Sequence, residues 1–151
     1  MLGASPKIEI KGLSGKRIGI VSSQWHPEIC DALIAGARRA IKEAGITEIT
    51  LRKVAGSFEI PLAAQRALDD GCDAVITVGL VLRGETPHFD YVCQGVTSGV
   101  MDVMLSRGKP IGFGVLMCDN VEQAHARSGL PGSKEDKGYD AAIAALDLLR
   151  D

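Results

Sequence analysis

The sequence predicts an α/β protein in which helices cover both faces of a small parallel sheet. Short apolar runs of strand type alternate along the chain with segments whose apolar residues recur at helical spacing. The run at 74–78 is apolar at almost every position, as is typical of a strand buried on both faces. Strands that alternate with helices form βαβ units with right-handed crossovers, and such units build a parallel sheet.

The individual elements follow from the same patterns. Strands are expected at 18–21, 48–54, 74–78 and 110–116. Helical spacing extends from Ile29 to Ala44, from Leu62 to Leu68 and from Phe89 to Val103, and two more helical patterns cover 120–127 and 138–150. The elements together predict a flavodoxin-like three-layer α/β/α sandwich with a four-stranded parallel sheet. Residues 1–15 are expected to form an extended N-terminal segment of one domain, 1–151.

Composition narrows the class of protein further. The 151 residues are 46% hydrophobic but only 4% aromatic, so the core must be aliphatic. A net charge of −2 gives no bulk electrostatic reason to expect nucleic acid or a membrane surface as partner. The start of the chain lacks the apolar core of a signal peptide, and the run 74–82 is too short to span a bilayer. Four separated cysteines and no histidine at metal-ligand spacing predict reduced thiols, no metal and a cytoplasmic location.

Ligands of open parallel sheets bind beyond the carboxyl ends of the strands, so the segments after Val21, Val54, Val78 and Phe113 are the places to search. After the first strand, Trp25 is equally well explained as a lid over the sheet and as a stacking platform for a planar heterocycle.

The second of these segments contains Ser57, Phe58 and Glu59. Pro61 suits a first helical turn, which places Ser57 and Glu59 around a helix N-terminus. Glu59 would there either interact with the helix dipole or accept hydrogen bonds from ligand hydroxyls, and spacing alone leaves both open.

The third segment has the highest density of functional side chains. Gly84 permits close approach of the backbone, and Glu85 and Thr86 lie just before a helix, where backbone N–H groups can bind a phosphate-sized anion. His88 follows in the first turn, and histidine is the side chain best suited to proton transfer near neutral pH, although a structural role is also common there.

The fourth segment and the residues after it contain three further candidate site residues, one aromatic and two cationic. Phe113 is flanked by Gly112 and Gly114, which leave its ring little local cover. Arg127 is interpreted as a helix-surface cation or as a phosphate clamp, and Lys137 at the start of the last helix is equally open.

Together these segments resemble the 6,7-dimethyl-8-ribityllumazine synthase (lumazine synthase) family. The resemblance covers about 17–149 and rests on several motifs in the right order: residues 56–61 (GSFEIP), 83–92 (RGETPHFDYV), 112–116 (GFGVL), Gln123-Ala124 with Arg127, and Lys137-Gly138. It implies a transferase of riboflavin biosynthesis, which condenses 5-amino-6-(D-ribitylamino)uracil with 3,4-dihydroxy-2-butanone 4-phosphate and releases phosphate, without metal or organic cofactor. The alternatives are a non-catalytic lumazine- or flavin-binding protein and a generic phosphate or nucleotide binder, for which no glycine-rich nucleotide motif is present.

The resemblance also implies roles for single residues. Trp25 is similar to the aromatic residue that stacks on the pyrimidine, Ser57, Phe58 and Glu59 to the segment that holds the ribityl chain, and Leu80, Val81 and Leu82 to the segment that lines the pyrimidine pocket. Glu85, Thr86 and Arg127 match the phosphate site, with Lys137 as a second cation. His88 matches the proton-transfer residue, and Phe113 the residue that reaches in from a neighbouring subunit.

The family assembles as pentamers, paired pentamers or 60-subunit shells. This chain has a long, proline-bearing segment at 128–136, which in the family is associated with pentamers because it obstructs the packing of pentamers into shells. The resemblance therefore implies a homopentamer, with a decamer as the second choice and active sites shared between adjacent subunits. Association with riboflavin synthase is left open.

Overall fold

The computed structural model describes residues 2–151 and contains the expected four-stranded parallel sheet. Its strands are β1 (Arg17–Ser23), β2 (Glu48–Val54), β3 (Ala74–Leu82) and β4 (Ile111–Cys118). They are ordered β2-β1-β3-β4, and every neighbouring pair is parallel. Strands β2 and β4 are therefore the two edges of the sheet.

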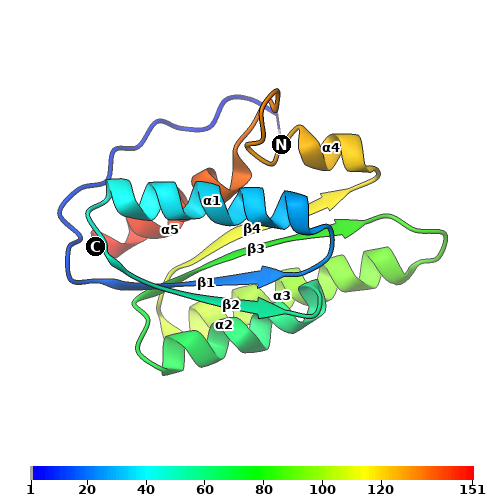
Figure 1. Ribbon diagram of the computed structural model, residues 1–151. Helices are drawn as coiled ribbons and strands as arrows, with labels where there is room; N and C mark the ends of the chain where they lie inside the picture. The colour runs from blue at the N-terminus through cyan, green and yellow to red at the C-terminus, as the bar shows by residue number, and fades with distance from the viewer. Residues whose placement is uncertain (1) are drawn as a thin grey trace.

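Helices cover both faces of the sheet, as the alternating pattern predicts. Helices α1 (Pro27–Glu43) and α5 (Lys137–Leu149) pack on one face, and α2 (Ile60–Asp69) and α3 (His88–Arg107) pack on the other (Figure 1). The 3-10 turn η1 (Ser57–Glu59) leads directly into α2, and the short helix α4 (Val121–His125) follows β4. The layers and the strand order are those of a flavodoxin-like sandwich.

Three strands are longer at their carboxyl ends than the sequence predicts. Strand β1 continues through Ser22 and Ser23, which are buried despite their hydroxyl groups, and β3 continues past Gly79. Strand β4 pairs with β3 as far as Cys118, which lies opposite Leu82. The expectation that Phe113 lies at the carboxyl end of the fourth strand is therefore wrong, because Phe113 lies opposite Thr77 in the middle of the sheet.

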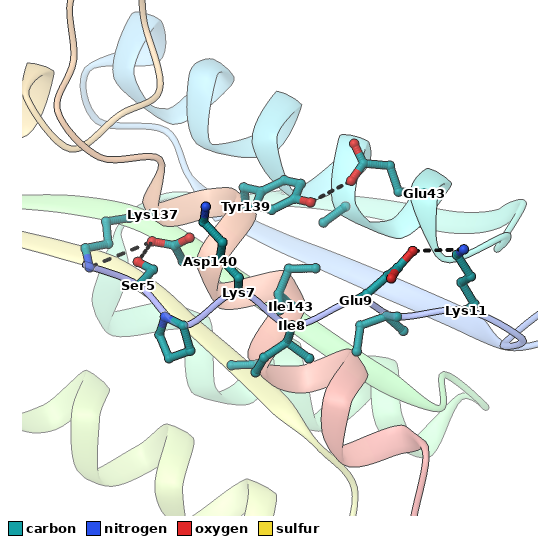
Figure 2. Close-up of a pocket in the computed structure, with 14 residues that line it drawn as sticks. Ser5, Lys7, Ile8, Glu9, Lys11, Glu43, Lys137, Tyr139, Asp140 and Ile143 are labelled. Carbon is teal, nitrogen blue, oxygen red and sulfur yellow. Dashed lines mark hydrogen bonds and ion pairs between the residues drawn. The ribbon is translucent and has the colours of Figure 1, made fainter. Parts of the chain in front are cut away.

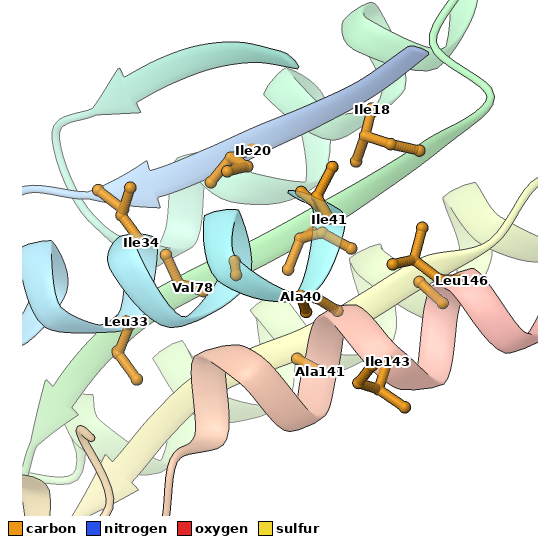
Figure 3. Packing of buried hydrophobic residues seen from close by; sticks show 14 of the residues in the cluster. Ile18, Ile20, Leu33, Ile34, Ala40, Ile41, Val78, Ala141, Ile143 and Leu146 are labelled. Atoms are coloured by element: carbon orange, nitrogen blue, oxygen red, sulfur yellow. The ribbon is translucent and has the colours of Figure 1, made fainter. Parts of the chain in front are cut away.

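The core is aliphatic and divided in two by the sheet. The larger cluster lies under α1 and α5 and includes Ile20, Leu33, Ile41 and Leu146 (Figure 3). The smaller cluster lies under α2 and α3. It includes Val75 of β3 and Val100 of α3. Among the described residues neither cluster contains a buried aromatic side chain, which agrees with the expectation from composition.

Residues 2–12 run without helix or strand over the layer formed by α1 and α5, and a turn at 13–16 leads into β1 (Figure 1). Ile10 is buried in the larger cluster, and Ile8 packs against it next to Ile143 (Figure 2). A cavity of about 870 Å³ lies between this segment and the two helices. Within residues 2–151, no helix has the length and apolar character needed to cross a membrane.

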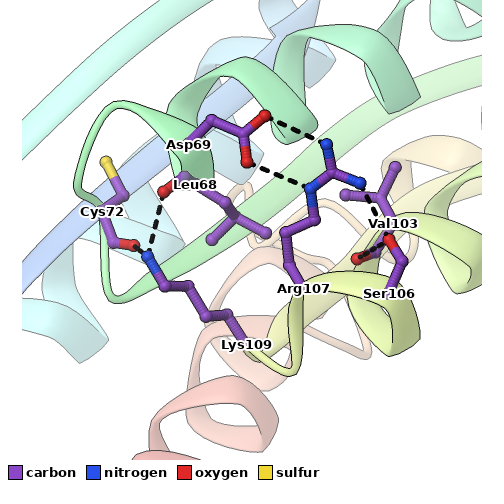
Figure 4. A network of polar contacts seen from close by, with 7 residues as sticks. All are labelled: Leu68, Asp69, Cys72, Val103, Ser106, Arg107 and Lys109. Carbon is purple, nitrogen blue, oxygen red and sulfur yellow. Dashed lines mark hydrogen bonds and ion pairs between the residues drawn. The ribbon is translucent and has the colours of Figure 1, made fainter.

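A polar network at the amino-terminal edge of the sheet joins α2 to α3 and β4 (Figure 4). Arg107 at the end of α3 donates two hydrogen bonds, of 3.0 and 3.1 Å, to the carboxylate of Asp69 and so holds the pKa of that carboxyl below its usual value. Lys109 donates from Nζ to the carbonyl oxygens of Leu68 and Cys72, each at 3.0 Å. The ammonium group therefore adds hydrogen bonds to carbonyl groups at and just after the C-terminus of α2.

Replacing Lys109 should lower the stability of the protein without changing the carboxyl edge of the sheet. Lys109→Met keeps most of the apolar stem but removes both hydrogen bonds, so we expect the free energy of unfolding to fall by about 1–2 kcal/mol. Urea denaturation measures this change, and Lys42→Met on the exposed side of α1 is the matched control. Equal stability of the two variants would contradict the role of Lys109 as a helix cap.

Candidate active site at the carboxyl edge of the sheet

The loops that follow the four strands meet at one edge of the sheet (Figure 1). Trp25, in the loop after β1, is 65% exposed, and its indole lies beside Gly56 in the loop after β2. A Cβ placed on Gly56 would be 3.3 Å from Nε1 of Trp25 and 3.3 Å from Oε2 of Glu59. The absence of a side chain at 56 thus lets an exposed ring and a carboxylate approach the same point.

The loop that carries Trp25 is held by hydrogen bonds from the first residues of α1. The Cys30 thiol donates to the Trp25 carbonyl oxygen at 3.1 Å, and burial raises the pKa of this thiol, which keeps the proton on sulfur. His26 adopts a left-handed conformation with φ of 53°, and its carbonyl accepts hydrogen bonds from the first turn of α1. These hydrogen bonds fix the backbone of the turn, and the Trp25 indole remains exposed to solvent.

The turn η1 places its three side chains in different environments. Ser57 is buried, and within the described residues its Oγ has no hydrogen-bond partner. Phe58 is 62% exposed and lies against Gly95 of α3, where a Cβ would approach its ring to 2.5 Å. Glu59 is exposed and stands at the N-terminus of α2. Ser57, Phe58 and Glu59 thus line a junction between α2, α3 and the sheet.

The segment after β3 is the most open part of this edge. Leu80, Val81 and Leu82 belong to the end of β3 itself, and residues 83–88 are exposed. Thr86 accepts a hydrogen bond from the backbone N–H of His88 at 3.4 Å, and His88 is the first residue of α3. Glu85, Thr86 and His88 are therefore brought together before a helix N-terminus, as the sequence predicts.

Sequence reasoning gave no role to Arg83, although this side chain joins three parts of the site. Its Nε donates to Asp119 after β4 at 2.8 Å, and Nη1 lies 3.6 Å from Asp90 in the first turn of α3. The guanidinium also lies over the ring of Phe89, 4.3 Å from its centroid. The position of an arginine directly after a strand and before Gly84 was the one signal available in the sequence.

The remaining three candidates are carried by other elements of the fold. Phe113 is 41% exposed on the edge strand β4, five residues and about 16 Å before the end of that strand. Arg127 follows α4 and donates from Nη1 to the carbonyl oxygen of Gln123 at 2.9 Å. Lys137 lines the cavity beneath the N-terminal segment next to Asp140 (Figure 2). Its Nζ lies 3.9 Å from Asp140 and 2.9 Å from Glu135. Residues 2–151 contain no group of three His, Cys, Asp or Glu side chains arranged to hold a metal ion.

The fold and this edge define a class of protein: a parallel α/β protein with an exposed aromatic ring, a carboxylate and a histidine at the start of a helix above the carboxyl ends of its strands. Residues 15–151 match the family profile described as 6,7-dimethyl-8-ribityllumazine synthase, and the chain belongs to this family.

Curated relatives agree with the family assignment. The chain is 53% identical over 145 residues to 6,7-dimethyl-8-ribityllumazine synthase of Kineococcus radiotolerans, covering 96% of this chain and 89% of the relative. It is 58% identical over 130 residues to the synthase of Paenarthrobacter aurescens, covering 86% and 80% of the two chains. The corresponding protein of Frankia casuarinae is 51% identical over 154 residues, with 99% and 95% covered.

Two glycines at this edge should respond differently to a methyl group. A Cβ at Gly79 would lie 2.7 Å from Oγ of Ser23 and 3.1 Å from Oγ of Ser57, whereas a Cβ at Gly84 has no atom within 4 Å. We expect Gly79→Ala to lower the free energy of unfolding by about 1–3 kcal/mol through overpacking. Gly84→Ala should stay within about 0.5 kcal/mol. Denaturant midpoints at equal m-values measure both, and a destabilised Gly84→Ala would show that the chain itself requires glycine there.

Proposed function

We propose that this protein is a 6,7-dimethyl-8-ribityllumazine synthase of riboflavin biosynthesis. It condenses 5-amino-6-(D-ribitylamino)uracil with 3,4-dihydroxy-2-butanone 4-phosphate and releases orthophosphate and water, with no metal or organic cofactor. The observation that carries this proposal is the meeting of Trp25 and Glu59 at Gly56, at the same edge of the sheet as the start of α3 with His88. Such a site offers a stacking surface, an acceptor for hydroxyls and a proton carrier within one edge of the sheet.

The pyrimidine and its ribityl chain are assigned to the half of the edge formed by the first three loops. The Trp25 indole stacks on the pyrimidine ring, and the ends of Leu80, Val81 and Leu82 line its pocket. Ser57, Phe58 and Glu59 hold the ribityl chain, since the carboxylate accepts hydrogen bonds from hydroxyls. The unpaired Oγ of buried Ser57 supports this assignment, because a buried hydroxyl without a partner costs free energy that a ligand hydrogen bond recovers.

The phosphate is assigned to the N–H groups of Glu85 and Thr86 with the guanidinium of Arg127, and with Lys137 as a second cation. Helix starts favour anions because their backbone N–H groups are unpaired and the helix dipole is positive there. Gly84 supports the assignment, since its open surroundings within the chain leave room for a phosphate against the backbone.

The chemistry requires positioning and proton transfer more than a strong nucleophile. The substrate amine attacks the ketone, and loss of water gives a Schiff base. Proton removal and cleavage of the carbon–oxygen bond then expel phosphate, after which the second nitrogen closes the ring with loss of water. His88 carries protons in these steps, and the two binding regions hold the reactants in contact.

His88→Ala should slow turnover by about ten- to a hundredfold without abolishing it, because proton transfer contributes about 10²–10⁴ and water substitutes in part. Steady-state formation of the fluorescent lumazine from the two substrates measures the rate. An unchanged rate would remove His88 from its role. If the wild-type chain binds lumazine but forms none, the protein is the non-catalytic binder instead.

We further propose a homopentamer, with a decamer as the alternative, in which Phe113 completes the site of an adjacent subunit. Exposed apolar side chains support an interface on this side of the molecule. Tyr91, Met101 and Leu105 follow one side of α3, opposite its buried valines, and Phe113 and Met117 are exposed on the edge strand β4. Patches of this kind on a folded chain are typical of contact surfaces. A cytoplasmic location and association with riboflavin synthase stay predictions.

The assembly has a direct test. Light scattering should give the mass of five chains, or ten for a decamer, and a particle near sixty chains would contradict the proposal. Leu105→Glu introduces a charge into the apolar side of α3, so we expect smaller species and a loss of activity of at least about tenfold, because charges are disfavoured in interface cores. Lys42→Glu on exposed α1 is the control. Full activity of a monomeric Leu105→Glu chain would show that sites are not shared.

A further inference from the structure

We propose that Asp136 is a positioning residue that fixes the segment 126–137 on helix α1 and thereby sets the affinity of the site for phosphate through Arg127. The inference rests on the proposed function, in which Arg127 binds the phosphate group. Asp136 itself contacts no substrate in this proposal.

Backbone hydrogen bonds within the segment 126–137 connect Asp136 to Arg127. Ser128 and Asp136 form an antiparallel bridge, and the N–H of Lys137 donates to the carbonyl oxygen of Arg127 at 3.0 Å. The N–H of Glu135 donates to Ala126 at 3.0 Å in the same ladder. A displacement of Asp136 therefore moves the backbone of Arg127 with it.

The carboxylate of Asp136 is held by both helices that it touches. It caps α5 by accepting from the N–H of Tyr139 at 3.4 Å, and it forms an ion pair with Arg39 of α1. It also lies over Gly36 of α1, where a Cβ would be 2.5 Å from Oδ1. The site on α1 thus has room for this carboxylate only because residue 36 lacks a side chain.

Arg39 is fixed in turn by Tyr139. Its guanidinium lies over the tyrosine ring, 4.9 Å from the centroid, and the tyrosine hydroxyl donates to Glu43 at 2.5 Å (Figure 2). The carboxylate of Glu43 raises the pKa of Tyr139, so the hydroxyl keeps its proton and the bond at neutral pH. Since a cation and a ring are fixed around it, the side chain of Asp136 has one preferred position.

This arrangement matters because a guanidinium binds phosphate through two parallel hydrogen bonds, whose strength depends on alignment. Misplacement of a positioning group by about 1 Å can cost up to about a hundredfold in rate. Asp136 contacts α1 and α5, whereas most of the pyrimidine half of the site is assigned to η1 and to the end of β3.

The test compares three kinetic constants in the assembled enzyme. We expect Asp136→Ala to raise both the KM for the butanone phosphate and the inhibition constant of inorganic phosphate by about tenfold. The KM for the pyrimidine should stay within about twofold. Asp136→Asn keeps an oxygen for the helix cap but loses the ion pair, so its two phosphate constants should fall between wild type and Asp136→Ala. Arg39→Gln removes the same pair from α1 and should resemble Asp136→Asn, which keeps the test valid if Asp136→Ala fails to fold.

Two controls separate the possible failures. Asp147→Ala removes an ion pair at the far end of α5 and should leave all three constants unchanged. Arg127→Lys should raise the two phosphate constants, and if it does not, the proposed phosphate site is wrong irrespective of Asp136. If Arg127→Lys raises them but the Asp136 and Arg39 variants change only the melting temperature, or raise the pyrimidine KM equally, Asp136 is a structural cap and the inference is overturned.

Discussion

The close seating of α5 against α1 and β4 is the constraint on which the rest of the molecule depends. A Cβ at Gly138 would overlap the carbonyl of Leu33 in α1, and one at Gly112 would overlap the carbonyl of Ala141 in α5. Because glycine has no side chain, the helix backbone lies directly on its neighbours and closes the larger core. The same contact fixes where α5 begins, and hence where Arg127 and Lys137 emerge.

Stability and chemistry are separated along the strands of the sheet. At the amino-terminal edge, Arg107 and Lys109 join α2 to the residues that precede β4, and both side chains are used in internal bonds. At the carboxyl edge, Trp25, Glu59 and His88 make few bonds of their own and remain exposed. A parallel sheet permits this separation, because all of its strands deliver their following loops to one edge.

The sequence predicted the layers, the parallel sheet and the order of the elements, because period-2 and helical patterns report which faces are buried. It missed the true strand ends because Ser22 and Ser23 are polar yet buried, and because Gly79 resembles a strand terminator. The error mattered for Phe113, which lies within β4 rather than at its carboxyl end. Partners such as Arg39 with Asp136 are 97 residues apart, and a local pattern carries no information on such a pair.

The distribution of aromatic rings connects the core, the site and the assembly. An aliphatic core fills the space under both helical layers, so the rings of Trp25, Phe58, Tyr91 and Phe113 are left largely exposed. Burial of apolar surface stabilises a protein by roughly 25 cal/mol per Å², and exposed rings forgo this free energy. Trp25 and Phe58 lie at the carboxyl edge of the sheet, and Tyr91 and Phe113 lie on α3 and on the edge strand β4. In the proposed function, the substrate covers the first pair and a neighbouring chain covers the second. If the neighbour's ring also closes the substrate site, then binding of substrate and assembly bury the same surface, and each must strengthen the other.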